Sequence, residues 1–303
     1  GLTPAEVGVI VDNQADMRDI TATLVDLAVR GWIVIEEEED AKLFGLVTDK
    51  DYVFRRVRAD DPPGPHERRL MKAVFDGRES RRLSGLKNKF YRDLPDLKSQ
   101  LQEALIEHGV YEQSPAKVAG KYAALGAVVT AVVFFGGLTI GRAFYLAPLA
   151  VVLSAAGCAI VIIGFGLVMP ARTKHGTELL RQVKGFEEFL ERVESDRFKR
   201  MITGPEMFER YLPHAMALGV ETQWAEAFAD IYREPPDWYH GSDFGRFNSR
   251  VFVSSLDSMS ASTHSVMRSA PRSSGGSSFG GGGVSGGGGF SGGGFGGGGG
   301  GAF

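Results

Sequence analysis

The sequence predicts an α+β membrane protein in which a winged-helix-like cytosolic domain, a two-helix transmembrane hairpin, a small all-α cytosolic domain and a disordered Gly-rich tail follow one another. Three observations lead to this fold class. Only one charged residue, Arg142, lies between Lys121 and Arg172. A helix pattern and β-rich runs precede that stretch, an amphipathic helix pattern follows it, and the end of the chain is mostly serine and glycine.

These patterns divide the chain into consecutive segments. We expect the winged-helix-like domain at residues 1–112, a linker at 113–121, transmembrane helices at 122–141 and 149–171 around a short non-cytoplasmic turn at 142–148, the helical domain at 172–236 and the tail at 237–303. The chain begins with Gly1 rather than Met and shows no apolar run near that end. We therefore expect a fragment or a processed product.

The first domain is predicted from a helix followed by a β-hairpin, the outline of a winged helix. Asp19 can cap a helix at residues 19–30, and Gly31 can end it in the left-handed conformation. An acidic turn is expected at residues 36–40. Strand patterns lie at residues 32–35, 43–47 and 52–57. Further helices are predicted at residues 66–75 and 94–107, with a short helix starting at Ser80 or Ser84.

Charge argues against nucleic-acid binding, a common role of winged helices. The adjacent acids at residues 36–40 would repel a phosphate backbone. The net charge of −3 also does not indicate a basic, DNA-binding chain. One basic cluster leaves three interpretations open: a solvated face, contact with anionic lipid headgroups, or nucleic acid. It consists of Arg78, Arg81, Arg82, Lys87 and Lys89.

The two apolar runs have the length that a bilayer requires, roughly 20 residues for each helix. Gly141, Arg142 and Pro148 mark the break between them. The alternative is a pair of buried core helices, but such helices normally carry a polar face and these have none. We interpret Arg142 as an interfacial arginine at the turn rather than a functional charge inside the membrane.

Cations flank the outer ends of both runs, which predicts their orientation. Lys117 and Lys121 precede the first run, and Arg172 and Lys174 follow the second. By the positive-inside rule both outer ends face the cytoplasm. We therefore expect a multi-pass protein of the plasma membrane with both soluble segments in the cytoplasm.

The segment after the hairpin is predicted to be helical and rich in aromatic residues. An amphipathic helix is expected over residues 179–193, followed by helices at 205–218, bent by Pro213, and 222–232. From about His240 the periodicity is lost, and the glycine-rich end cannot bury enough apolar surface to fold. The only side chains there that we expect to make apolar contacts are Phe279, Phe290, Phe295 and Phe303. The residues that we consider for contact with a partner are Trp32, Tyr211, Pro213, His214, Trp224 and Phe228.

Catalytic and metal-binding motifs are not found. Two Gly-x-Ser-x-Gly matches, centred on Ser285 and Ser291, lie in the glycine-rich segment without the strand and helix that a nucleophile elbow needs. The histidines do not have metal-ligand spacing, and the single cysteine, Cys158, lies in the second apolar run. We expect no cofactor.

The order of segments resembles the YciQ-like family of predicted membrane proteins, a family of unknown function. The resemblance rests on DITATLVDLAVRGW at residues 19–32, the apolar hairpin, GFEEFL at 185–190, YLPHAMALGV at 211–220 and the glycine tail. It implies a signal peptide, an exported β-rich domain and a further membrane span upstream in full-length members. The end Gly301-Ala302-Phe303 departs from the usual glycine run ending in tryptophan. The family brings no established activity and no catalytic residues.

We therefore hypothesise a membrane-anchored interaction or scaffold protein that contacts the lipid bilayer and binds a protein partner, or a second copy of itself, at the cytosolic face. A component of a membrane enzyme or transport complex is the alternative. A membrane-tethered transcription regulator is the third hypothesis, and nucleic acid is not the expected partner.

Overall fold

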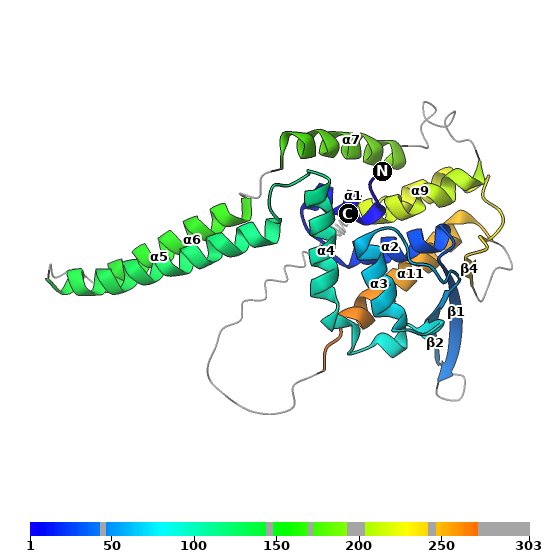
Figure 1. Cartoon of the computed structure of the whole chain (residues 1–303), viewed down its shortest axis with the longest axis horizontal. Coiled ribbons are helices and arrows are strands. Elements are labelled where there is room, and N and C mark those ends of the chain that lie inside the picture. The colour runs from blue at the N-terminus through cyan, green and yellow to red at the C-terminus, as the bar shows by residue number, and fades with distance from the viewer. Residues whose placement is uncertain (43–46, 144–147, 169–171, 193–203, 242–246, 272–303) are drawn as a thin grey trace, which may run out of the picture. The chain divides into compact units, whose positions relative to one another are not determined.

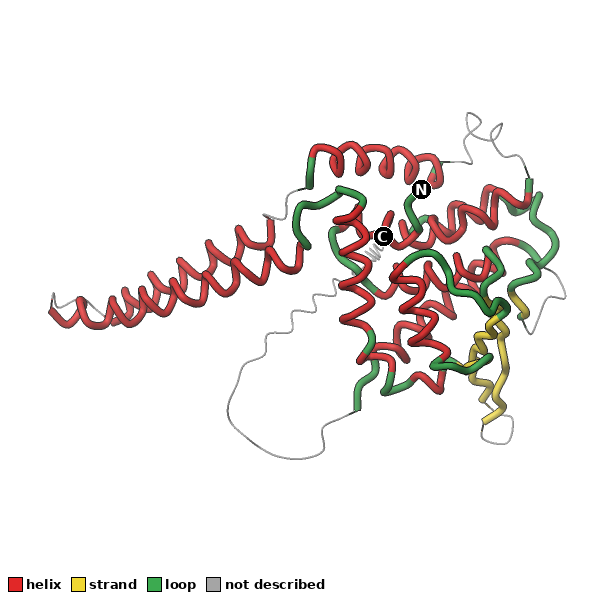
Figure 2. Tube along the Cα trace, viewed as in Figure 1, coloured by secondary structure: helices red, strands yellow, loops and turns green. Residues whose placement is uncertain are grey.

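The computed structural model describes the chain except residues 43–46, 144–147, 169–171, 193–203, 242–246 and 272–303. Its described elements are mostly helical, and the strands gather in one sheet (Figure 2). Residues Gly1–Ala270 form one compact unit. The mixture of helices and a sheet confirms the α and β content of the predicted fold class.

Two capped helices begin the chain (Figure 1). Helix α1 spans Pro4–Asp12, and helix α2 spans Met17–Val29. The N-cap of α2 is Asp16, whose side chain accepts from the N–H groups of Arg18 and Asp19, so the expected cap at Asp19 is three residues too late. Asp19 instead returns a hydrogen bond to the Asp16 N–H, which completes a capping box. Gly31 follows α2 with a φ of +75°, as expected for a left-handed stop.

The sheet has the strand order β3-β2-β1-β4. Strand β1 (Ile33–Lys42) pairs antiparallel with β2 (Val47–Arg56), from Ile33 opposite Arg56 to Lys42 opposite Val47. The acidic residues 36–40 therefore lie in β1, and the prediction of a turn there is wrong. Cross-strand cations make this possible: Lys50 Nζ lies 2.5 Å from Glu37 Oε1, and Arg55 Nη2 lies 2.9 Å from Glu36 Oε2.

Short elements complete the sheet and cover one end of it. Strand β3 (Ser80–Arg82) pairs antiparallel with β2, and the two-residue β4 (Tyr239–His240) pairs parallel with β1. Helix α2 followed by β1 and β2 matches the expected helix-and-hairpin outline, but β4 comes from far along the chain. Around them lie α3 (Pro65–Phe75), the 3₁₀ turns η1 (Ser84–Leu86) and η2 (Phe90–Arg92), and α4 (Leu94–Glu107).

The segments before and after the apolar helices share one core, which corrects the division into two soluble domains. Helices α7 (Lys174–Glu191), α9 (Pro205–Leu218), α10 (Glu221–Ala227) and α11 (Ser249–Arg268) belong to the later segment. Phe208, Trp224 and Phe252 from this segment lie in the same buried cluster as Leu24 and Phe54 from the earlier one. A single body results because each segment leaves an apolar face that the other covers.

Helix α11 contradicts the prediction that disorder begins at residue 237. Asn248 caps the helix by accepting from the Val251 N–H at 2.9 Å. Four large side chains of α11 are fully buried: Phe252, Leu256, Met259 and Met267. Their spacing is helical despite the many serines between them. The glycine-rich end after Pro271, with its four phenylalanines, lies outside the described residues.

Helices α5 (Pro115–Ala143) and α6 (Pro148–Val168) lie side by side (Figure 1). Most of the expected linker at residues 113–121 belongs to α5, so that boundary was placed too late. One stretch, Lys117–Thr139, is long and apolar enough to cross a membrane, and Leu149–Ile162 forms a shorter apolar helix. Of the expected turn at 142–148, residues 144–147 lie outside the described part of the chain.

Candidate functional site

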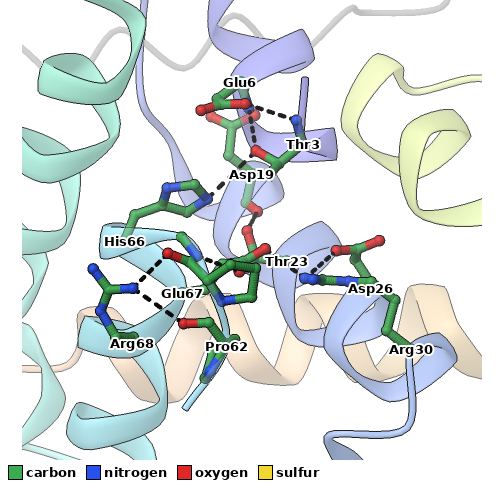
Figure 3. A network of polar contacts seen from close by, with 12 residues as sticks. Thr3, Glu6, Asp19, Thr23, Asp26, Arg30, Pro62, His66, Glu67 and Arg68 are labelled. Atoms are coloured by element: carbon green, nitrogen blue, oxygen red, sulfur yellow. Dashed lines mark hydrogen bonds and ion pairs between the residues drawn. The ribbon is translucent and has the colours of Figure 1, made fainter. Parts of the chain in front are cut away.

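A buried polar network joins the first three helices (Figure 3). The Thr3 N–H donates to Glu6 Oε2 at 2.7 Å, which closes the capping box of α1. The Thr3 hydroxyl lies 3.4 Å from His66 Nε2 on α3. Glu6 and His66 are only 3% and 4% exposed, so this contact holds α1 against α3 inside the body.

The second half of the network is an arginine between two carboxylates. Arg30 contacts Asp26 Oδ2 at 2.6 Å and also pairs with Glu67 at the start of α3. Glu67 is 1% exposed and accepts from the Gly64 N–H at 3.0 Å, as a capping box requires. Because a buried carboxylate needs such partners, Arg30 ties the end of α2 to α3.

Burial shifts the protonation of three groups in this region. Desolvation raises the pKa of Asp19 to about 8, although the hydrogen bond from Asp16 opposes the shift. Desolvation also raises the pKa of Asp26 to about 6, against the attraction of Arg30. It lowers the pKa of His66, with Glu6 and Glu67 acting in the opposite direction. Asp19 therefore carries a proton over much of the neutral pH range.

These groups stabilise the packing of the helices and do not form a metal centre. Among the described residues, no group of three or more His, Cys, Asp or Glu side chains could hold a metal ion. The close approach of α1 and α2 explains the burial of Asp19: a Cβ added to Gly8 would lie 2.1 Å from Asp19 Oδ1. A side chain at position 8 would therefore have to displace the Asp19 carboxylate.

An open groove of about 800 Å³ lies beside this network. Its walls come from the end of α2, the start of β1, the end of β2, the start of α9 and the loop at residues 231–238. Val57 and Ile231, which are 58% and 43% exposed, line it. Glu209 fixes part of its wall, since its carboxylate accepts from Trp238 Nε1 at 2.8 Å and from the Tyr232 hydroxyl at 2.9 Å.

Charge on this groove is mainly negative. Three acidic side chains, Glu209, Glu234 and Asp237, line it together with one cation, Arg233. The surface therefore combines apolar side chains with a negative rim. Such a surface is chemically suited to an apolar segment that carries positive charge.

Four of the six candidate contact residues are packed inside the body. Trp32 is 6% exposed, with the guanidinium of Arg58 4.9 Å from its ring centroid. Trp224 and Phe228 are fully buried, and Trp224 Nε1 donates to the Phe208 carbonyl at 3.1 Å. Pro213 is also buried, inside α9. These residues stabilise the core and do not offer a surface in this fold.

Tyr211 and His214 are the two candidates that remain half-buried. Their ring centroids lie 6.3 Å apart, and Phe186 of α7 contacts both rings. His214 also lines a cavity of about 430 Å³ that shares Glu209 with the larger groove. Burial lowers the pKa of His214, and its Nδ1 has no hydrogen-bond partner among the described atoms.

Sequence reasoning did not identify Glu209, Tyr232 and Trp238 as a group. Their hydrogen bonds connect α9 to a loop more than twenty residues later. A glutamate on a helix beside aromatic residues has no distinctive spacing. The only available signal was the density of aromatic residues between 208 and 239.

The chain ends of the apolar helix pair meet at one point of the body. Tyr111, just before α5, forms an isolated antiparallel bridge with Arg172, just before α7. The Thr173 hydroxyl donates to the Gly109 carbonyl at 2.6 Å, and the Thr173 N–H donates to the Val110 carbonyl at 3.0 Å. Arg172 Nη2 donates to the Ile10 carbonyl at 2.7 Å. We call this junction the clamp.

Large apolar side chains cover the outward faces of α5 and α6. Each member of this apolar belt is at least 47% exposed. The belt consists of Leu125, Val128, Val132, Phe135, Leu149, Val152, Leu153, Ile160, Val161 and Phe165. An exposed apolar patch of this extent is characteristic of a surface that meets lipid or another protein.

Comparison with known proteins identifies a matching family. A family model described as the C-terminal domain of a predicted membrane protein (DUF2207) matches residues 1–228. None of the curated proteins matches the chain, and neither does any solved structure.

Proposed function

The chain belongs to the DUF2207 C-terminal-domain family of predicted membrane proteins, and from this premise we propose that it is a membrane-anchored interaction protein. In the proposal, α5 and α6 form a transmembrane hairpin in the plasma membrane. The compact body lies in the cytoplasm and binds a protein partner through the groove. The same proposal includes two narrower assignments: the chain to the YciQ-like family, and its N-terminal part to a winged-helix-like fold.

The apolar belt carries the membrane part of the proposal. Side chains such as Phe135 and Phe165, which are 66% and 62% exposed, would be costly to leave in water. Inside hydrocarbon the same exposure is favourable. Small residues on the facing sides, such as Gly137 and Ala155, favour close packing of the two helices there.

The clamp supports a hairpin whose two ends lie on the same side of the membrane. Because Tyr111 and Arg172 are bridged, the chain leaves and re-enters the body at one place. A hairpin of two spans also returns the chain to its starting side. The cations Lys117, Lys121 and Lys174 near this place favour the cytoplasm.

The groove supports a protein partner as the occupant. Its exposed apolar residues and its negative rim are suited to an apolar segment that contains lysine or arginine. Helix α2 argues against DNA reading, because Thr21, Thr23 and Asp26, which a reading helix would present to the bases, are at most 9% exposed.

Topology reporters test the anchoring. Fusions placed before Lys117 and after Lys174 should both report a cytoplasmic location. Opposite locations at the two positions would reject the hairpin, and two external locations would reverse the orientation.

Site-specific photo-crosslinking in native membranes tests the partner surface. A photoreactive residue at Ile231 or Val57 should give a discrete protein adduct, whereas Val251 on α11, which is 45% exposed and outside the groove, should not.

Glu234→Lys together with Asp237→Lys should weaken the adduct by repelling a cationic partner. An adduct with twice the chain mass would identify a second copy. Equal adducts at all three positions would reject the groove as the binding surface, and a co-purified small molecule would favour an enzyme or transport component.

A further inference from the structure

A second cavity, of about 440 Å³, lies at the edge of the sheet where β2, β3 and η1 meet. The pairing of β2 with β3 places Arg55 opposite Ser80 and Phe54 opposite Arg81. The Leu83 N–H then donates to the Tyr52 carbonyl at 2.7 Å, and Asp51 accepts from the Ser84 hydroxyl at 2.6 Å, which fixes the turn into η1. We call this cavity the arginine pocket.

Arg81 is the unusual residue of the arginine pocket. Its side chain lines the cavity, although the residue as a whole is only 9% exposed. Nη2 donates to the Gly85 carbonyl at 3.0 Å. Nε and Nη1 are buried and have no hydrogen-bond partner among the described atoms. A buried guanidinium with two nitrogens that lack acceptors is costly, and an anion can supply those acceptors.

The surrounding charges leave the pocket positive. Five cations and one carboxylate line it: Arg55, Arg78, Arg81, Arg82, Lys89 and Glu38. Arg55 is engaged by Glu36 at 2.9 Å, and Arg82 by Glu38 at 2.5 Å. In the part of the chain that the structure describes, no ion pair is found for Arg78, Arg81 or Lys89. The available carboxylates therefore do not satisfy the cations.

We propose that the arginine pocket binds a phosphate group. Nε and Nη1 of Arg81 lack acceptors, and the oxygens of a phosphate are acceptors that a guanidinium binds strongly. Arg78 and Lys89 supply further positive charge at the rim. The phosphate belongs either to an anionic phospholipid headgroup or to a soluble phosphate compound, and the volume admits either. This inference does not depend on the groove or on a protein partner.

Full-length protein in lipid nanodiscs tests the proposal in two arms. In the first arm, discs of phosphatidylcholine are titrated with inorganic phosphate and pyrophosphate by calorimetry. In the second, phosphatidylglycerol with a photoreactive headgroup is added to the discs, and adducts on residues 78–89 are mapped by mass spectrometry. Binding in the first arm alone identifies a soluble phosphate compound. Adducts in the second arm alone identify a lipid headgroup, and both results together show that the pocket accepts either.

Variants distinguish a built pocket from general attraction to positive charge. Arg81→Gln should weaken binding about tenfold or more in the responding arm, because it removes charge-assisted hydrogen bonds. Lys89→Gln, at an exposed rim position, should weaken it several-fold without risk to the fold. Lys87→Gln is the matched control, since Lys87 is exposed and does not line the pocket. If Arg81→Gln does not fold, Lys89→Gln against Lys87→Gln decides. Equal effects of these two variants, or no binding in either arm, would overturn the proposal.

Discussion

The backbone of Tyr111 is bridged to that of Arg172, although the whole apolar helix pair lies between them in the sequence. The Tyr111 hydroxyl also donates to Asn13 Oδ1 at 2.7 Å, and Arg172 reaches the Ile10 carbonyl. The two residues therefore fasten the base of the helix pair to the end of α1. A substitution that disturbs this junction should therefore destabilise the compact body as well as the apolar helices.

Gly176 provides a direct test of the clamp. A Cβ at this position would lie 2.3 Å from the Val110 carbonyl oxygen, so Gly176→Ala must displace backbone. We expect a loss of about 1–3 kcal/mol of stability. The matched variant is Gly185→Ala in the same helix, where nothing lies within 4 Å of the added Cβ. It should be neutral or stabilising by up to about 1 kcal/mol. Thermal unfolding of detergent-solubilised protein measures both, and equal melting temperatures would contradict the clamp.

Gly137 tests the packing between α5 and α6. An added Cβ would approach Val151 Cγ1 to 2.6 Å, and a β-branched side chain in a helix has few alternative rotamers. Gly137→Ala should therefore separate the helices, whereas Gly136→Ala, with nothing within 4 Å, should not. Disulfide trapping between cysteines introduced at facing positions, in a Cys158→Ser background, reports the separation. The same trapping rate in both variants would show that the two helices do not pack as described.

Local patterns in the sequence were sufficient for most of the elements. The apolar runs of α5 and α6 and the periodic helices α3, α4 and α9 could be located because each carries its own signal. The start of β1 was predicted, but its acidic continuation at residues 36–40 was missed because the stabilising partners, Lys50 and Arg55, lie on the other strand of the hairpin. Helix α11 was missed because serines separate its few apolar residues.

Long-range packing could not be predicted in the same way. Nothing local indicates that Trp224 and Phe228 pack with α2 and β1 in one core and are therefore hidden. Aromatic residues in a helix were equally compatible with a binding surface. The candidate groove depends on the same long-range contacts, since its walls come from segments that are far apart in the sequence.

Asp19 should make stability depend on pH. Its pKa of about 8 in the folded state lies above the ordinary aspartate value of 3.8, so the folded state binds an additional proton between these two pH values. The contribution of Asp19 to the free energy of unfolding is fully present below about pH 4 and is lost as the pH rises towards 8. The free energy of unfolding then falls by at most about 1.4 kcal/mol per pH unit. His66, whose pKa is lowered from 6.5, has the opposite slope, which ends near pH 6.5.

The window from pH 6.5 to 8 therefore isolates Asp19. Asp19→Asn keeps an acceptor for the Asp16 N–H and should flatten the decline in that window. Asp76→Asn is the control, because Asp76 is exposed and its left-handed conformation suits asparagine. Denaturant unfolding of the full chain at pH 6.5, 7.2 and 8.0 compares the three proteins. A decline in Asp19→Asn as steep as in the original protein would show that another group titrates.

Two truncations distinguish α11 from the segment that follows it. A chain that stops after Asn248 lacks the buried side chains Phe252, Leu256 and Met259, each of which contributes about 1.5–3 kcal/mol by burial. We expect it to lose the fold or to melt many degrees lower. A chain that stops after Ala270 retains the whole compact unit and should melt at the original temperature. Membrane insertion should be unchanged in both, because α5 and α6 remain. A drop of several degrees in the longer truncation would show that residues beyond Ala270 also pack against the body.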